Sequence, residues 1–460
     1  MTTQAEPEDR AALIGRLRAA HRMRAGSGTI GPTDRTSPRQ ATGPKAFDFA
    51  SLPRAKTLSM QHAAMETVGL SNPFFRVHDG APGPEPVISG APRISFSSYN
   101  YLGLNGHPKV AAAAKDAIDR YGVSAMASRV VGGERPYHRA LEERLAAHYG
   151  TEDAVVMVSG HATNVTTVGT LLDQDDLILM DQLSHNSIAE GAKLSRAHRL
   201  VFPHNDYDWL EERLTQIRGR HRHVLIAVEG LYSMDGDSPD LARLIEIKRR
   251  HDAWLMVDEA HGMGVLGPTG RGVAEAQGID PQSVEIWMGT LSKTLAGCGG
   301  YISGSRALID ILKFSAPGFV FSVGISAPVA AAALAALEVM EAEPERVERL
   351  QANGRRLLAS AREAGLDTGL SQGSAVTPAI IGDSIKAIAV SHFLLQKGVS
   401  VLPITHPAVP ERQARLRFFL TSEHNAAQID EAVGRTVESC GEVDRLVAEL
   451  TGQQADLTGT

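Results

Sequence analysis

The sequence has little cysteine, no long apolar run and no excess of positive charge. Its two cysteines, Cys298 and Cys440, are too few for a disulfide framework, which favours a reducing compartment. No stretch is apolar for long enough to cross a bilayer, since the alanine-rich residues 327–337 are too few. The formal charge of -7 gives no general attraction to nucleic acid or to anionic membranes. The first residues include acids where a signal peptide needs basic ones. We therefore expect a cytoplasmic protein.

What is present is ordinary for a globular protein. With 460 residues, of which 43% are hydrophobic and 22% charged, the chain can bury a large core divided between a large and a small domain. Residues 1–46 combine a short helical pattern with basic edges and a stretch rich in Gly, Thr, Ser and Pro. They are predicted to be a flexible extension. Residues 47–93 are predicted to form an arm that packs on another surface.

Short apolar runs alternate with helical patterns through the middle of the chain. The runs cover residues 154–159, 177–181, 198–202, 223–229, 254–258 and 285–289. This alternation is typical of a parallel sheet covered by helices on both faces, and predicts a large α/β domain over residues 94–325. A long helix and strand-like runs at 376–381, 399–404 and 416–421 predict a smaller α/β domain over residues 326–452, with a tail at 453–460. Sheets of the first kind bind ligands at the carboxyl ends of their strands.

One lysine stands among small residues after the last run of the large domain. Lys293 lies in Thr290-Leu-Ser-Lys-Thr-Leu-Ala-Gly-Cys-Gly-Gly300, where glycine and alanine let backbone and ligand approach closely. A lysine that loses solvent has a lower pKa and can form a Schiff base with a carbonyl cofactor. The alternative is a loop lysine in water, and for a lone lysine that is the better interpretation.

Two polar residues lie at the end of the run at 254–258 and just beyond it. Asp258 can hold a proton on a heteroaromatic nitrogen and so turn a bound ring into an electron sink. His261, three residues later, can hydrogen-bond a ring hydroxyl. The alternative is an aspartate that caps a helix beside a packed histidine. The sequence leaves both readings open at this point.

Other residues offer groups for a phosphate, a ring or a carboxylate. Gly160 and His161 begin a predicted helix whose free N–H groups suit a phosphate, and Thr290 offers a hydroxyl to the same group. Ser233 can donate to a cofactor, or it belongs to a simple turn. His138 can stack on a planar ring, although a lone histidine at a helix start is more often on the surface or in the core.

An arginine on a predicted strand is a candidate carboxylate ligand. Arg417 shares one strand face with Arg415, because successive strand residues point to opposite sides. Arginine can grip a carboxylate bidentately. A solvated edge strand is the alternative.

Together these stretches resemble the α-oxoamine synthase family of enzymes that depend on pyridoxal 5'-phosphate (PLP). The resemblance covers about residues 47–450. Seven motifs carry it in family order: Asn100-Tyr-Leu-Gly-Leu104, Ser128-Arg129, His138, Ser233-Met-Asp-Gly-Asp237, Asp258-Glu-Ala-His261, Thr290-Leu-Ser-Lys293 and Arg417. It implies the PLP-dependent fold type I, which is like that of aspartate aminotransferase, with PLP bound by the large domain. No metal site is predicted.

The resemblance also implies a role for each candidate. Lys293 would form the Schiff base, Asp258 would pair with the pyridine nitrogen, and His138 would stack on the ring. His261 and Ser233 would hold the 3-hydroxyl, whereas Thr290 and the backbone at Gly160 and His161 would bind the phosphate. A hydroxyl from the partner subunit also reaches the phosphate in this family, and Ser322 is its candidate. The substrate side would include Asn100, Ser128, His185 and Arg417.

The implied reaction is a decarboxylative condensation of a small amino acid with an acyl thioester. The amino acid displaces Lys293, which then removes the α-proton; thiol and CO2 leave, and an α-amino ketone is released. Members specific for glycine carry Thr at the position of Ser128. The smaller serine leaves room for a side chain, which favours alanine or serine. Glycine remains possible, because other members use it without that threonine.

Three features depart from the family pattern or extend it. Thr294 stands where Gly, Ala or Ser is usual, and His161 stands where Phe or Tyr is common. The N-terminal extension suggests docking to an acyl-carrier protein, so the thioester could come from coenzyme A or from a carrier. The family also implies a homodimer with shared active sites. Two alternatives remain: an aminotransferase on the same scaffold, and a non-catalytic subunit, which would be expected to lack Lys293.

Overall fold

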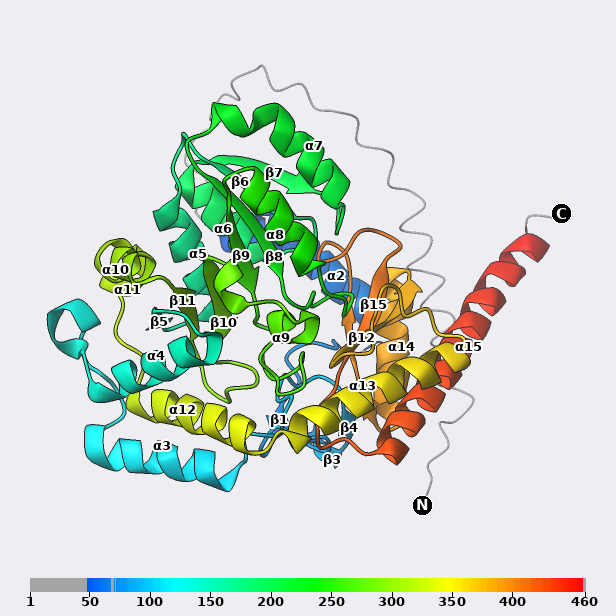
Figure 1. Cartoon of the computed structure of the whole chain (residues 1–460). Helices are drawn as coiled ribbons and strands as arrows, with labels where there is room; N and C mark the ends of the chain where they lie inside the picture. The colour runs from blue at the N-terminus through cyan, green and yellow to red at the C-terminus, as the bar shows by residue number, and fades with distance from the viewer. Residues whose placement is uncertain (1–47, 68–69, 71, 458–460) are drawn as a thin grey trace.

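The computed structural model describes residues 48–67, 70 and 72–457. The predicted flexible extension at 1–46, with its helical pattern, lies outside the described residues. The chain forms a large and a smaller α/β unit, each built on its own sheet (Figure 1). This confirms the predicted fold class. No helix in the described ranges is both long and apolar enough to cross a membrane.

The larger sheet has seven strands in the order β5-β11-β10-β9-β8-β6-β7 (Figure 1). The strands are β5 (Asp153–Met157), β6 (Leu177–Asp181), β7 (His198–Phe202), β8 (Val224–Glu229), β9 (Trp254–Asp258), β10 (Ile286–Thr290) and β11 (Gly300–Gly304). β7, β6, β8, β9 and β10 pair in parallel, whereas β11 runs antiparallel between β10 and β5. The six predicted runs correspond to β5–β10, and the run at 154–159 ends as a strand at Met157. β11 was not predicted.

Alternate residues of the strands face two separate apolar layers. Val155, Ile178 and Met256 belong to one layer, whereas Val156, Leu179 and Val257 belong to the other. The first layer includes residues of α5 (Gly160–Leu171), α6 (Asn186–Ser195) and α10 (Arg306–Ser315). The second includes residues of α4 (Pro136–Tyr149), α7 (Tyr207–Ile217), α8 (Leu241–Arg250) and α12 (Ala327–Ala342). Because both faces are covered, the central strands are apolar along their whole length.

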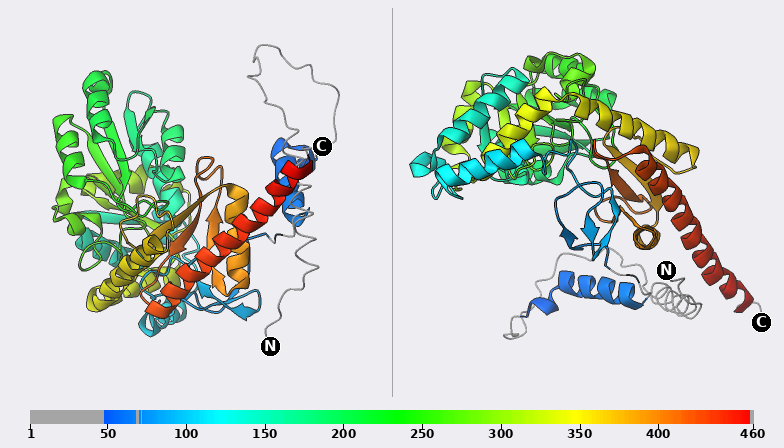
Figure 2. Two further views of the ribbon diagram at one scale, coloured as in Figure 1. Left: turned by 90° about the vertical axis from the view of Figure 1, so that its right-hand side faces the viewer. Right: turned by 90° about the horizontal axis from the view of Figure 1, so that it is seen from below.

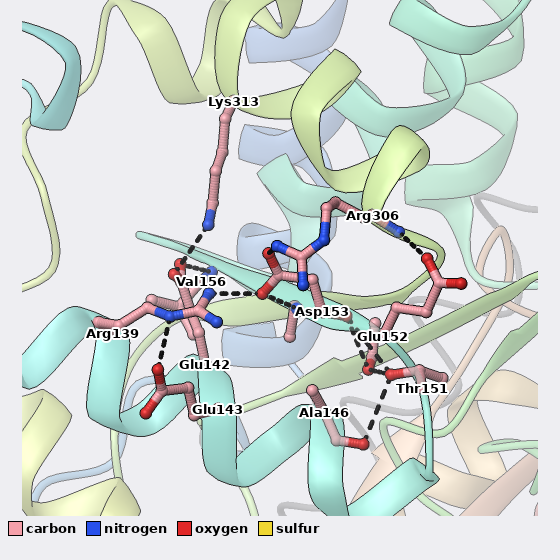
Figure 3. A network of polar contacts seen from close by, with 12 residues as sticks. Arg139, Glu142, Glu143, Ala146, Thr151, Glu152, Asp153, Val156, Arg306 and Lys313 are labelled. Carbon is pink, nitrogen blue, oxygen red and sulfur yellow. Dashed lines mark hydrogen bonds and ion pairs between the residues drawn. The ribbon is translucent and has the colours of Figure 1, made fainter.

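The edge strand β5 is held by a polar network (Figure 3). The buried Glu142 of α4 accepts hydrogen bonds from the Val156 N–H at 3.0 Å and from Lys313 Nζ of α10 at 3.0 Å. Arg139 Nη1 donates to Asp153 Oδ1 at 2.6 Å. The network provides a hydrogen-bond acceptor for the Val156 N–H, which lies on the unpaired side of the edge strand β5. It also fixes α4 and α10 beside the strand that leads into Gly160.

The smaller unit contains a three-stranded antiparallel sheet in the order β12-β15-β14. Its elements are β12 (Val376–Gly382), β14 (Leu402–Ile404), β15 (Ala414–Phe419), α13 (Glu345–Glu363), α14 (Ser384–Gln396) and α15 (Ala426–Leu457). Figure 2 shows α15 running along this unit and extending past it. α15 continues beyond residue 452, where the small domain was predicted to end. The predicted domain boundaries stay predictions.

The run at 399–404 is divided between two sheets. β13 (Val399–Ser400) pairs in parallel with β4 (Ile94–Ser95), whereas β14 pairs with β15. Pro403 is tolerated because β14 is an edge strand, where a missing N–H costs no ladder bond. The start of the large predicted domain is therefore paired with the smaller unit.

The remaining elements are short or peripheral. Ahead of β4 come η1 (Phe49–Ser51), α2 (Pro53–Thr67) and the small sheet of β1 (His78–Asp79), β2 (Val87–Ile88) and β3 (Ala91–Pro92). α3 (Pro108–Tyr121) packs against α12. The others are η2 (Arg129–Gly133), η3 (Arg218–Arg220), α9 (Val273–Gln277), η4 (Pro281–Ser283) and α11 (Pro317–Val320).

Candidate active site

Lys293 lies three residues beyond β10, in the loop that leads to β11. The loop is closed by backbone hydrogen bonds from Leu291 N to Gly299 O at 2.9 Å and from Gly297 N to Leu291 O at 2.7 Å. Burial lowers the pKa of Lys293 to about 8, against the opposing effect of the Asp258 and Glu229 carboxylates. A substantial fraction of this amine is therefore neutral near pH 8, as a nucleophile or proton acceptor requires.

Asp258 ends β9 and is buried. Its Oδ1 accepts from the Ala260 N–H at 2.9 Å, and its Oδ2 accepts from Asn164 Nδ2 at 2.8 Å. Asn164 Nδ2 also reaches Ser187 Oγ at 2.9 Å, and Ser187 Oγ lies 2.6 Å from His185 Nδ1. A continuous polar chain thus joins the ends of β9, α5 and α6, and it places His185 in the same group as Asp258.

Sequence reasoning did not assign roles to Asn164 and Ser187. A signal for Asn164 was available, because it lies four residues after Gly160 and so on the same helix face. Ser187 carries no comparable signal.

His261 lies three residues beyond β9 and is also buried. Its Nδ1 is 2.6 Å from the Tyr101 hydroxyl. Burial, followed by the positive charges of Lys293 and Arg417, holds the pKa of His261 well below its usual value. A neutral imidazole is therefore fixed beside Lys293. Tyr101 belongs to the Asn100–Leu104 motif, but sequence reasoning gave it no role.

The predicted phosphate site is a close contact between α5 and β10. A Cβ on Gly160 would lie 2.8 Å from Thr290 Oγ1, so only glycine lets the first turn of α5 approach β10 this closely. Ser159 caps α5, its side chain accepting from the Ala162 N–H. The N–H groups of Gly160 and His161 remain as donors at a helix N-terminus, an arrangement that suits a phosphate.

Ser233 and Glu229 lie at the end of β8. The buried Ser233 donates its N–H to Glu229 Oε2 at 3.2 Å, and Glu229 is the register partner of Asp258. Burial, together with the charge of Asp258, raises the pKa of Glu229 to about 8. A second carboxyl group, held neutral at pH 7, therefore lies beside Asp258. Sequence reasoning gave Glu229 no role.

Arg417 comes from the smaller unit and reaches the same group. Its Nη1 donates to Ser233 O at 3.0 Å, and its guanidinium lies 4.5 Å from the Phe419 ring centre. Its Nε is buried without a partner among the described residues. β15 is the central strand of its sheet, which excludes the solvated edge strand. Arg415 instead pairs with Asp235, at 2.7 Å.

His138 is held by local hydrogen bonds. It is fully buried, its Nδ1 accepts from the Arg135 N–H at 3.1 Å, and its Nε2 lies 2.9 Å from Ile325 O. A Cβ on Gly324 would come within 2.8 Å of the ring. His138 therefore braces the start of α4 against the segment before α12, and these contacts do not join it to Lys293 or Asp258. His185 is the histidine that the structure brings to Asp258.

Three other predicted residues also lie outside the central group. Asn100 uses its amide locally, donating to Pro82 O at 2.8 Å and accepting from the Asn105 N–H at 3.1 Å. Ser128 forms an isolated β-bridge with Val323. Ser322 lines a narrow cavity next to Arg129 and Phe319. Their predicted roles stay predictions.

The arrangement has the donor set that PLP requires. A half-buried amine of lowered pKa, a buried carboxylate, a histidine–hydroxyl pair and a helix N-terminus at a glycine contact fit the aldehyde, pyridine nitrogen, 3-hydroxyl and phosphate of this cofactor. The unpartnered Arg417 Nε provides a further donor for a substrate carboxylate.

Comparison with known proteins gives the same assignment. The family model "Aminotransferase class I and II" matches residues 91–435. An 8-amino-7-oxononanoate synthase of Anaeromyxobacter sp. (strain K) is 41% identical over 76% of this chain and 87% of its own. The serine palmitoyltransferase of Sphingomonas wittichii superposes with a TM-score of 0.82 at 31% identity, over 86% of this chain and 99% of its own.

A further solved structure, SPT with a PLP internal aldimine, has a TM-score of 0.82 at 30% identity, over 86% of this chain and all of its own. A structural relative with the same fold therefore binds PLP as its cofactor. The chain therefore belongs to the α-oxoamine synthase group of the aminotransferase class I and II family, PLP-dependent enzymes that condense an amino acid with an acyl thioester and release CO2.

Proposed function

We propose that this enzyme uses alanine, or serine as the second choice, and an acyl thioester to make an α-amino ketone. The observation that carries the proposal is the single group formed by the buried Asp258 and His261 with the half-buried Lys293 and the more exposed His185. A lysine with a pKa of about 8 in that setting is suited to bind a carbonyl carbon and to accept a proton at Nζ.

The residues that would hold PLP follow from their contacts. Lys293 would bind its carbonyl carbon, Asp258 its pyridine nitrogen, and the first turn of α5 with Thr290 its phosphate. Bound in this way, PLP supplies an electron sink for the bond that breaks at the α-carbon. Asn164 orients the Asp258 carboxylate through its 2.8 Å hydrogen bond.

His185 is our candidate for the ring that stacks on the cofactor, in place of His138. The charges of Asp258, Lys293 and His161 all act on the His185 imidazole, and its pKa is lowered chiefly by burial. Its ring centre lies 6.2 Å from that of His161 in a perpendicular arrangement. Both imidazoles therefore border the same site, where family members often carry an aromatic in place of His161.

Arg417 would bind the substrate carboxylate, which lets Lys293 reach the α-hydrogen. Because Arg417 also holds Ser233 O at 3.0 Å, substrate binding at this guanidinium is coupled to the loop that carries Ser233. Burial lowers the pKa of Arg417, and a carboxylate would restore the missing counter-charge.

The choice of alanine rests on the relatives and on Ser128. The product that gives the 41% identical relative its name, 8-amino-7-oxononanoate, carries a methyl group on its amino-bearing carbon, which is the skeleton that decarboxylated alanine leaves. The 31% identical structural relative is a serine palmitoyltransferase. Ser128 leaves more space than threonine, which favours a side chain over glycine.

We infer a homodimer that shares its active sites. Met126, Val131 and Phe321 are each more than 80% exposed, and α11, which ends just before Phe321, contacts η2, which contains Val131. Contiguous exposed apolar residues of this size are typical of an interface. Ser322 lies within this surface, where it would face the partner.

The acyl carrier and the compartment complete the proposal. The donor is an acyl-CoA or an acyl-carrier protein, and the N-terminal extension is our candidate docking element for a carrier. Cys298 and Cys440 are both free, and we infer a cytoplasmic location from the reducing environment that free thiols favour.

The test is the visible spectrum of the purified protein with PLP, recorded before and after separate additions of glycine, alanine and serine. We expect a yellow band that Lys293→Ala alters and that alanine perturbs most strongly. The same amino acid should then release thiol from acyl-CoA or acyl-carrier substrates.

Each other result points to a different function. A protein that stays colourless with PLP would overturn the enzyme and indicate the non-catalytic subunit. Complete conversion of the cofactor by keto acids, without any thioester, would indicate an aminotransferase. A stronger response to serine or glycine would overturn only the choice of amino acid.

A further inference from the structure

His204 lies between two buried carboxylates at the edge of the site. It follows β7, and its Nδ1 is 2.9 Å from Asp181 Oδ1 while its Nε2 is 2.8 Å from Asp237 Oδ2. The Asp181 and Asp237 side chains are only 0% and 6% exposed. Asp181 ends β6 and Asp237 lies beyond β8, so one imidazole joins the ends of two strands of the large sheet.

The partners determine the charge of this ring. An ionised carboxylate only accepts hydrogen bonds, so two such partners require a proton on both ring nitrogens. Burial alone would lower the pKa of His204, but the hydrogen bonds and charges of Asp181 and Asp237 outweigh it and raise the pKa to about 10. The ring is therefore an imidazolium throughout the neutral range.

Uncharged groups complete the surroundings of the ring. The Tyr232 ring lies perpendicular to it at 4.5 Å between centres. Asn205 Nδ2 donates to Asp237 Oδ2 at 3.1 Å, and the Tyr207 hydroxyl donates to Asn205 Oδ1 at 2.9 Å. Burial raises the pKa of both Tyr207 and Tyr232 above the usual value. Neither tyrosine therefore adds a negative charge near pH 7.

Asp181 organises the turn that leads to His185. Its Oδ1 also accepts from the Leu183 N–H at 2.8 Å, and its carbonyl accepts from the Ser184 N–H at 3.0 Å. Rotation of this carboxylate would release the turn immediately before His185. His204 fixes its orientation from the opposite side.

Asp237 organises the turn that carries Ser233. The Asp237 carbonyl accepts from the Tyr232 N–H at 2.8 Å, and the Tyr232 carbonyl accepts from the Gly236 N–H at 2.8 Å. Ser233 lies inside this closed turn. Arg417 binds the Ser233 carbonyl from the smaller unit, while Asp237 is tied to His204 from the larger sheet.

We propose that His204 is a positioning residue for the condensation: held between Asp181 and Asp237, it locks together the two turns that carry His185 and Ser233. It acts through those turns and touches neither substrate nor cofactor. The inference rests on the roles proposed above for His185 and Ser233. It adds that one residue, His204, supports the turns that carry both of them.

The first test reads the charge of the ring in the unmodified protein. Histidine labelled with ¹⁵N, with the His204 signal identified by its loss in His204→Gln, should show both ring nitrogens protonated and not titrating from pH 6 to pH 9. A ring that is neutral at pH 8 would overturn the proposal. This test needs no substrate, and the charge is read in the parent protein.

The second test is kinetic, with His221→Gln as the matched control, since His221 is a histidine of the same sheet region outside the Asp181–His204–Asp237 group. His204→Gln should lower kcat about tenfold or more, and should shift the pH dependence of the visible PLP band, because Ser233 would be displaced. A lowered Tm with an unchanged kcat and an unchanged band would show a purely structural role and overturn the proposal.

The third test asks whether charge is responsible. His204→Gln leaves two facing carboxylates, and adding Asp237→Asn removes one of them. The double variant should therefore melt at a higher temperature than His204→Gln alone, which is non-additive behaviour for residues in one network. Additive losses would overturn the proposal. If the parent protein still shows the yellow band that depends on Lys293, failure of this test contradicts the role of His204 and leaves the proposed function standing.

Discussion

Among single residues, Glu229 has a direct consequence for stability. It is fully enclosed at the end of β8, where burial and Asp258 raise its pKa to about 8. In the unfolded chain this carboxyl ionises near pH 4.5, so folding must hold it neutral. Because its pKa is raised by folding, Glu229 does not destabilise the folded state through its charge below pH 4.5. The loss of folding stability then grows as the pH rises toward 8.

We therefore expect Glu229→Gln to stabilise the cofactor-free protein at pH 7–8 by roughly 1–3 kcal/mol. The gain should vanish near pH 4.5, where the parent carboxyl is neutral in both states. Chemical denaturation at several pH values measures this difference, with the exposed Glu246→Gln of α8 as control. A gain that does not change with pH would show that charge is not the cause.

Residue chemistry also shows how far the site could be predicted. Lys293, Asp258 and His261 were predicted because each lies at the end of an apolar strand or three residues beyond it, a position that chain order reveals. His138 lies in the first turn of α4 and His185 caps α6, and chain order does not show that two local hydrogen bonds occupy the His138 ring. Glu229, Asn164 and Tyr101 lie inside recognised stretches, but their partners come from other strands and helices.

At the level of elements, the contact between α5 and β10 decides how the phosphate is held. Gly160→Ala would place a methyl group 2.8 Å from Thr290 Oγ1. Either α5 or β10 must shift, and the N–H groups of the first turn of α5 then no longer point at the phosphate. We expect the dissociation constant of PLP to rise about tenfold, which corresponds to about 1.4 kcal/mol.

Titration of the visible band with PLP measures that effect. The control is Gly219→Ala, because an added Cβ there has nothing within 4 Å. Equal affinities in the two variants would exclude the close contact as the reason for glycine.

The elements differ in how well the sequence predicts them. The runs at 177–181 and 254–258 coincide with β6 and β9, because buried parallel strands are largely apolar. The run at 198–202 coincides with the edge strand β7, although three of its five residues are exposed. β11 was not predicted because it begins and ends with glycine and follows the Gly-rich loop. The division of 399–404 between two sheets depends on the arm strand β4, which local pattern does not reveal.

The whole molecule is expected to function as a pair. Phe321→Glu combined with Val131→Asp would place charges in the proposed interface, where desolvation opposes them. We expect sedimentation at the monomer mass and loss of about 90% or more of the activity, with the Tm of each monomer largely kept.

Leu370→Asp is the control, since Leu370 is also exposed, at 58%, but lies in the smaller unit. A double variant that stays dimeric and active would place the interface elsewhere. A monomer with full activity would show that each chain completes its own site.

The pairing of β4 with β13 also affects how the protein is made. The strand at Ile94–Ser95 finds its partner, Val399–Ser400, only after roughly 300 further residues have been synthesised. During translation the large sheet can form before β13 has been synthesised. Until then the backbone groups of β4 are unpaired and can pair with other chains. Synthesis that slows before residue 399 should therefore increase aggregation of the nascent chain, and a chaperone that covers β4 should have most of its effect in that interval.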